Sequence, residues 1–276
     1  MNDTYITKKT FDAQLGKAFI NIFRQYAILI PHCTNRLGFE PTLFLIKETL
    51  LKKTDSYTSE ILNYGWMPSE KTINIDREKL EIVSMYLSDN VPGVDIPDYQ
   101  SLKDLILKTY PLNQIIQKFG SELQGECKLT AYEYIHLVID GYATLIEALI
   151  KEYNKEGELI AYDIERKIRL SSPPQNCDNN IKQFMKDFAY LEKNKGLLSA
   201  ALSCTVKKVS ETEVIKDINE CEWARYFRER HPDVGYLIAC STDETEYLNY
   251  NKRLRMKRTK TLMEGGDCCD FHVFVI

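Results

Sequence analysis

The hydrophobic period of the chain changes near residue 198, and this change restricts the fold more than any other feature. Before it, apolar residues recur every three or four positions, as on one face of a helix. Over residues 198–206 they alternate with small or polar residues, and a second apolar run at 214–218 follows a turn at Ser210 and Glu211. This pattern is typical of an antiparallel hairpin. We therefore expect an α+β fold, in which N-terminal helices pack with a C-terminal antiparallel sheet.

Helical patterns dominate the first two thirds of the chain. We expect helices at 11–30, from Pro41 to 51, at 75–87, at 102–119 with a break at Pro111, from Thr130 onward, at 181–191 and at 220–230. Two further strands are expected at 254–262 and 269–276, joined by a turn that contains Gly265 and Gly266. A turn-rich run through Pro97 suggests a helical N-terminal region, 1–98, and an α+β domain, 99–276. Residues 171–180 are expected to form a loop.

The helix after Thr130 carries the strongest local signal. Thr130 and Glu133 have the spacing of a capping box, and a long apolar face follows, which indicates a central core helix. On its other side His136 and Asp140 lie one turn apart on a polar stripe. Such a pair could bind a metal or move a proton, but the stripe otherwise holds ordinary surface residues, so a solvated face is the favoured interpretation.

Composition excludes several classes of protein. The 276 residues hold 36 basic and 40 acidic side chains, a net charge of −4, which gives no general attraction for nucleic acid. No apolar stretch approaches the roughly 18 residues that a membrane span needs, and the first residues do not resemble a signal peptide. The eight cysteines are therefore expected to be reduced thiols in a cytoplasmic protein. Their spacing favours no structural metal site, and we predict no cofactor.

Alternate side chains of a strand point to opposite faces of the sheet, and this parity indicates which residues of the two C-terminal strands face the core. If 254–262 is one strand, Arg258 shares a face with Leu254 and Met256, and a guanidinium on an apolar face needs either an internal or a bound carboxylate. Six basic residues lie between positions 252 and 260, and two interpretations of this run are open. It forms mainly a charged sheet face, or its Arg258 anchors a small acid. In the last strand Cys269 falls on the apolar face and His272 on the other. The same parity predicts that Cys268 is more accessible to solvent than Cys269.

Three short motifs, in order, resemble a known family. RTKTLMEGGDCCDF at 258–271, CEWARYF at 221–227 and LIACSTD at 237–243 are similar to segments of the L-2-amino-thiazoline-4-carboxylic acid hydrolase family. The resemblance covers roughly residues 198–276 and extends at most to the helices from Leu129 onward. The first 100 or so residues and the doubled cysteine at 268–269 depart from it. Relatives of the family include four-vinyl-reductase-type domains that bind small molecules.

The resemblance implies hydrolysis of a carbon–nitrogen bond in a small carboxylated cyclic amidine, which opens a thiazoline ring to a carbamoyl-cysteine. Cys240 with Asp243 is the first choice of nucleophile and proton-transfer partner, and Cys269 is the second nucleophile. Candidate substrate-binding residues are Arg258 as a carboxylate clamp, and Asp267 and His272. The sequence leaves three alternatives open: buried packing roles for Cys240 and Cys269, turn roles for Asp243 and Asp267, and a ligand-binding module without catalysis.

The expected partner is thus a small carboxylated molecule, with neither nucleic acid nor membrane, and a homo-oligomer is possible. A third functional class, an interaction scaffold, would use the helical region 1–98, which is otherwise expected to cover the sheet or wall the pocket.

Overall fold

A computed structural model describes residues 9–46, 48–49, 126–170, 181–190 and 196–276. The helices are α1 (Leu15–Leu37), α2 (Phe39–Ile46), α7 (Ala131–Leu170), α8 (Ile181–Ala189), α9 (Leu197–Ala201), α10 (Glu222–Arg230), α11 (Gly235–Ala239) and α12 (Asp243–Tyr250). The strands are β1 (Thr10–Gln14), β2 (Glu126–Thr130), β3 (Leu202–Val209), β4 (Glu213–Cys221), β5 (Leu254–Lys257) and β6 (Cys269–Val275). The helices expected at 75–87 and 102–119, the boundary near residue 98 and the loop at 171–180 lie outside the described residues.

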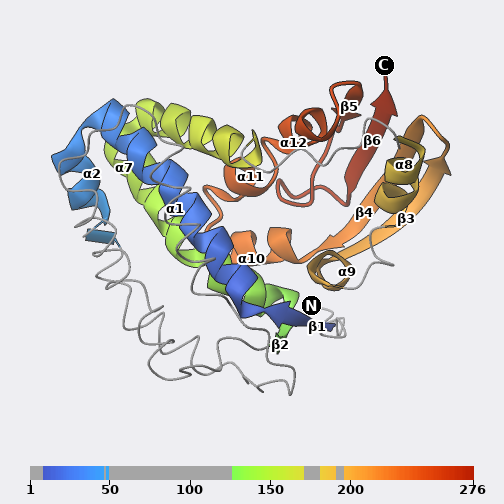
Figure 1. Cartoon of the computed structure of the whole chain (residues 1–276), viewed down its shortest axis with the longest axis horizontal. Helices are drawn as coiled ribbons and strands as arrows, with labels where there is room; N and C mark the ends of the chain where they lie inside the picture. The colour runs from blue at the N-terminus through green and yellow to red at the C-terminus, as the bar shows by residue number, and fades with distance from the viewer. Residues whose placement is uncertain (1–8, 47, 50–125, 171–180, 191–195) are drawn as a thin grey trace.

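The α+β prediction is confirmed. The four-stranded sheet has the order β3-β4-β6-β5, and every pair of neighbours is antiparallel. In Figure 1 the long helices α1 and α7 form one side of the molecule and this sheet the other, with α10 and α11 between them. A second sheet of two strands, β1 and β2, joins the start of α1 to the start of α7, with Thr10 opposite Thr130. No helix in the described ranges is long and apolar enough to cross a membrane.

The capping box before α7 forms as expected. The Thr130 amide donates to Glu133 Oε2 at 2.8 Å, and the Glu133 amide donates to Thr130 Oγ1 at 3.2 Å. The predicted apolar face is buried, so α7 is the central core helix. It bends at Asn154, whose backbone is not helical (φ 50°, ψ −126°). A Cβ on Gly157 would lie 2.4 Å from the Leu149 carbonyl oxygen, so the bend requires glycine there.

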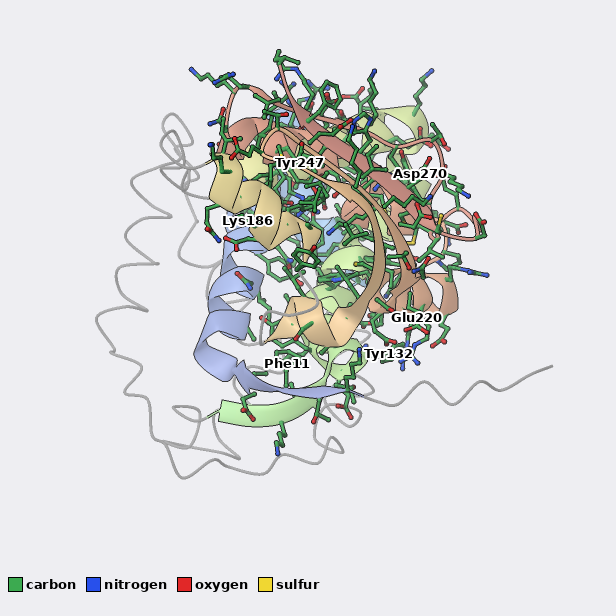
Figure 2. All side chains as sticks on the ribbon, turned by 90° about the vertical axis from the view of Figure 1, so that its right-hand side faces the viewer. Phe11, Tyr132, Lys186, Glu220, Tyr247 and Asp270 are labelled. Carbon is green, nitrogen blue, oxygen red and sulfur yellow. The ribbon has the colours of Figure 1, made fainter. Side chains whose placement is uncertain are left out.

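The core has two parts. One is built from α1, α7, α10 and α11, and the other lies between the sheet and α8. Met185 and Phe188 of α8 pack there with Phe271 and Val273 of β6. Figure 2 views the molecule from the sheet: Lys186 of α8 and Tyr247 of α12 lie to one side of the strands, and Asp270 lies to the other.

Three element boundaries differ from the sequence-based expectation. Residues 10–14 pair with β2, so α1 begins at Leu15 and continues through Pro31 to Leu37. Residues 197–201 form α9, and the hairpin begins at Leu202. β5 ends at Lys257 instead of residue 262, because Asp270 accepts hydrogen bonds from the backbone amides of Thr259 and Lys260.

Candidate active site

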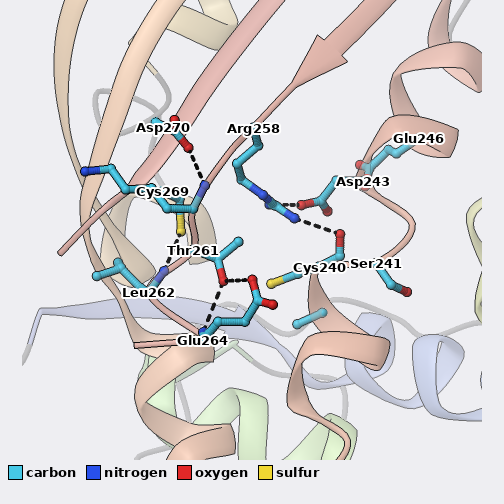
Figure 3. A network of polar contacts seen from close by, with 12 residues as sticks. Cys240, Ser241, Asp243, Glu246, Arg258, Thr261, Leu262, Glu264, Cys269 and Asp270 are labelled. Carbon is cyan, nitrogen blue, oxygen red and sulfur yellow. Dashed lines mark hydrogen bonds and ion pairs between the residues drawn. The ribbon is translucent and has the colours of Figure 1, made fainter. Parts of the chain in front are cut away.

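The Arg258 side chain joins two of the three sequence motifs. It follows β5 and is only 7% exposed. Its Nη1 donates to Asp243 Oδ2 at 2.6 Å and its Nη2 donates to the Cys240 carbonyl oxygen at 3.0 Å (Figure 3). The guanidinium also lies 5.0 Å from the centre of the Phe271 ring. Arg258 therefore points inward, as parity predicts, and its anionic partner in the structure is an internal carboxylate.

Asp243, the first residue of α12, lies between two guanidinium groups. Arg169, near the end of α7, places Nη2 4.0 Å from Asp243 Oδ1 and donates from Nη1 to Glu246 Oε2 at 2.7 Å. Burial raises the pKa of Asp243, and the charges of Arg169 and Arg258 act against that shift without cancelling it. A buried carboxyl with a raised pKa is better suited to accept and return a proton than an ordinary surface aspartate.

The thiols of Cys240, Cys269 and Cys221 lie close enough to interact electrostatically with one another. Cys240 directly follows α11, Cys269 begins β6 and Cys221 directly precedes α10. Burial raises the pKa of Cys240 strongly and Asp243 raises it further, while Arg258 lowers it. Burial also raises the pKa of Cys269. Two groups lower it in part: the Leu262 amide, which donates to Cys269 Sγ at 3.2 Å, and the charge of Arg258. All three are therefore protonated at neutral pH, and a nucleophilic thiolate would require a proton acceptor.

Cys221 is the third of these thiols, and sequence reasoning did not include it among the candidate site residues. Burial raises its pKa to about 12, and the backbone amides of Ala224 and Trp223 at the start of α10 act against this shift. Cys269 and Asp243 are among the groups that act on it electrostatically. The signal that could have found it is its place at the head of the CEWARYF motif.

The turn before β6 closes the site on one side. Thr261 is buried, donates from Oγ1 to Glu264 Oε2 at 2.9 Å and accepts from the Glu264 amide at 3.1 Å (Figure 3). A Cβ on Gly266 would lie 2.8 Å from the Thr261 carbonyl oxygen, and Gly265 has a φ of +88°. Both glycines are therefore needed for this turn. Sequence reasoning singled out the glycines but not Glu264.

Two candidates for substrate binding lie apart from Arg258. Asp267 has an 80% exposed side chain and pairs with Lys260 at 2.5 Å. His272 alternates with Phe271 and Val273, so it lies on the sheet face opposite Cys269, where its Nε2 is 2.8 Å from Glu213 Oε1. The structure thus brings together Cys240, Asp243, Cys269 and Arg258.

The predicted exposure of Cys268 is wrong. Cys268 and Cys269 are each 5% exposed. Cys268 directly precedes β6, and the Lys260 and Lys207 side chains lie close enough to interact with it electrostatically. Parity gives the face of the strand to which a residue points, but not what packs over it.

The solvated-face interpretation of the α7 stripe is also wrong. His136 and Asp140 are 0% and 3% exposed, because α10 packs over this side of α7. Tyr226 of α10 and His231, the residue after α10, approach Asp140 there. Over the part of the chain that the structure describes, no group of three or more His, Cys, Asp or Glu side chains is arranged to hold a metal ion.

Comparison with family models matches residues 133–273, about half of the chain, to L-2-amino-thiazoline-4-carboxylic acid hydrolase. No curated protein and no solved structure matches the chain. The matched range begins within the capping box of α7 and ends in β6. It contains the Arg258 network, the three thiols and the buried group around Asp140.

Proposed function

Because the chain belongs to the L-2-amino-thiazoline-4-carboxylic acid hydrolase family, we propose that it hydrolyses a carbon–nitrogen bond in a small carboxylated cyclic amidine or related heterocycle, opening a thiazoline-type ring. The observation that carries the proposal is the contact of Arg258 with both Asp243 and the backbone of Cys240. It unites a cation, a proton acceptor and a thiol-bearing residue, which are the groups that this chemistry needs.

The reaction we propose uses the Cys240 thiol as nucleophile. Asp243 accepts the thiol proton, and the thiolate sulphur attacks the electrophilic amidine carbon. The amidine reacts in its protonated form, so the ring nitrogen is an N–H after the attack. The bond from the carbon to this nitrogen then breaks as the nitrogen takes the proton from Asp243 and leaves as an amine, and the exocyclic amino group becomes the iminium. A water molecule adds to the same carbon, the enzyme sulphur departs with a proton, and the carbamoyl product is released. Cys269 takes the nucleophilic role if the substrate carbon approaches from β6.

Arg258 has a double role in this proposal. An arginine has five N–H donors, and the bonds to Asp243 and Cys240 use two of them. The same guanidinium can therefore support Asp243 and bind the substrate carboxylate. A cation at this position also stabilises a thiolate on Cys240 or Cys269, since its charge lowers the pKa of both.

The alternative function is a ligand-binding module without catalysis, related to four-vinyl-reductase-type domains. The raised pKa of each of the three thiols favours this alternative, because buried neutral cysteines pack well but react slowly. Such a module would bind a small acid saturably and release it unchanged.

The test is a ring-opening assay on a 2-amino-thiazoline-4-carboxylate with the full chain and the variants Cys240→Ser, Cys269→Ser and Asp243→Asn. Cys204→Ser, in β3, is the matched control. We expect loss of turnover in Cys240→Ser and Asp243→Asn and normal turnover in the control. Saturable binding by calorimetry without any product would support the binding module instead.

The same assay identifies the bond that breaks. Departure of the ring nitrogen leaves a product with a free amine and the carbamoyl group on sulphur. Departure of the ring sulphur would leave a free thiol and the carbamoyl group on nitrogen. A thiol-specific and an amine-specific reagent, applied to the protein-free filtrate, distinguish the two products. We expect the amine; a stoichiometric thiol would contradict the carbon–nitrogen assignment while leaving hydrolysis intact.

A further inference from the structure

A second group of buried polar side chains lies between α7 and the end of α10. His136, Asp140, Tyr226 and His231 are each at most 3% exposed, and Glu147 forms its edge with a side chain that is 33% exposed. The proposed hydrolysis uses none of these five residues. Burying ionisable side chains costs free energy of folding unless they are paired, so the pairing of these histidines and acids needs an explanation.

His231 has a carboxylate oxygen at each ring nitrogen. Its Nε2 lies 3.1 Å from Asp140 Oδ1, and its Nδ1 lies 3.0 Å from Glu147 Oε2. The Tyr226 hydroxyl donates to the same Asp140 oxygen at 2.8 Å. His136 Nδ1 is 3.3 Å from the Tyr226 hydroxyl oxygen, which can accept a hydrogen bond because its proton points to Asp140.

This geometry selects one protonation state of His231. A neutral imidazole has a single N–H, so it would turn a lone pair toward one of the two carboxylates. Only the imidazolium carries a proton on both nitrogens, so that Nε2 can hydrogen bond to Asp140 and Nδ1 can form an ion pair with Glu147. We propose that His231 is held as an imidazolium between Asp140 and Glu147, and that this charge fixes the connection between α10 and α11 against α7.

The anchored stretch carries two cysteines of the candidate active site. α10 begins directly after Cys221, and α11 ends directly before Cys240. His231 lies between the two helices, and both helices pack against α7. His231 is thus a positioning residue that acts through the backbone, and its importance for ring opening rests on the proposed function.

The charged and titratable groups around His231 come from two helices. They are His136, Asp140 and Glu147 of α7, and Tyr226 and Arg230 of α10. Burial lowers the pKa of His231, but its hydrogen bond to Asp140, its ion-pair contact with Glu147 and the charges of both carboxylates outweigh burial, so the net direction is upward. Arg230 is a cation in this group, and its charge lowers the pKa of Tyr226.

The sign of the pH dependence follows. A histidine with a raised pKa in the folded state stabilises the fold fully below the unfolded pKa of 6.5. This contribution is lost as the pH rises through the folded pKa. The α10–α11 connection should therefore loosen in mildly alkaline solution, while the rest of α7 stays packed.

The direct test is nitrogen-15 NMR of the four histidine rings in the full chain, assigned through backbone connectivities, between pH 6 and 9. We expect both ring nitrogens of His231 to be protonated at pH 7, with a titration midpoint above that pH. Glu147→Gln should lower that midpoint by about one pH unit, because it removes one of the two carboxylates. Glu158→Gln, an exposed carboxylate further along α7, is the matched control and should leave the midpoint unchanged.

Hydrogen–deuterium exchange of residues 231–240, corrected for the intrinsic rate, supplies a second readout. We expect protection to fall through the His231 midpoint, and at lower pH in Glu147→Gln. A neutral His231 ring at pH 7, or a midpoint that Glu147→Gln does not move, would overturn the proposal. Neither measurement needs a substrate, so a normal His231 titration without ring opening would count against the hydrolase proposal alone.

Discussion

Arg258 donates to Asp243 over 2.6 Å from a position 15 residues further along the chain, and the two side chains are 7% and 16% exposed. The pair joins the connection after β5 to the start of α12. A buried pair of this kind adds little net stability, because desolvation of both charges offsets much of their attraction. Its value lies in placing a cation and a carboxylate beside Cys240.

Arg258→Lys should lower kcat/KM for a carboxylated thiazoline about 10- to 100-fold, because lysine cannot donate in parallel to a carboxylate and to the Cys240 carbonyl. The comparison that separates its two roles uses the same heterocycle with a carboxamide in place of the carboxylate. If Arg258 binds the substrate carboxylate, the variant and the parent protein differ much less on the carboxamide. An equal loss of kcat/KM on both compounds would show that Arg258 supports Asp243 but does not bind the substrate carboxylate.

Arg169→Gln should shift the acidic limb of the pH–rate profile to higher pH by about one unit, because it removes one of the two cations that lower the pKa of Asp243. Asp243 must be ionised to accept a proton, so turnover appears only above its pKa. The control is Arg166→Gln, an exposed arginine on the same helix. An unchanged profile in Arg169→Gln would show that Asp243 does not set the acidic limb.

Glu165→Gln should make the protein more stable above pH 7. Glu165 is buried in α7, where burial raises its pKa to about 7 and the Tyr142 hydroxyl donates to it at 2.6 Å. Since the folded state favours the protonated acid, the free energy of unfolding falls as the pH rises from 4.5 to about 7, by up to about 3 kcal/mol. Urea titrations at pH 5 and pH 8 measure the difference. The same pH dependence in Glu165→Gln and the parent protein would assign it to other groups.

Gly157→Ala should destabilise the fold by about 1–3 kcal/mol, since the added methyl group would meet the backbone of Leu149 across the bend of α7. Glu158→Ala, at the exposed neighbouring position, should change the unfolding midpoint little. If Gly157→Ala unfolds at the parent temperature, the bend at Asn154 is not required by packing.

Local signals in the sequence predicted several features of the fold and the site. The Thr130–Glu133 capping box marks the start of α7, because both hydrogen bonds depend only on residues three apart. The change of period predicted the β3–β4 hairpin. The inward direction of Arg258 followed from the parity of the β5 strand that precedes it, although the strand ends one residue earlier.

Features set by distant neighbours could not be predicted. The stripe with His136 and Asp140 has the spacing of a solvated face, and only the packing of α10 on α7 shows that it is buried. β1 is a strand because β2 lies beside it, more than 100 residues later in the chain. Strand parity did not predict the burial of Cys268, and the motif that contains Cys221 includes neither Cys269 nor Asp243, which act on its thiol electrostatically.

The central claim is that a thiol beside Arg258 forms a covalent intermediate with the substrate. The most direct measurement is acid quenching of the full chain during turnover of a 2-amino-thiazoline-4-carboxylate, followed by intact-mass and peptide mass spectrometry. We predict a substrate-sized mass increase on the peptide that contains Cys240, and its absence in Cys240→Ser and in Asp243→Asn, which lacks the acceptor for the thiol proton. Ring opening at the parent rate in both Cys240→Ser and Cys269→Ser, with no adduct on any cysteine, would contradict the account.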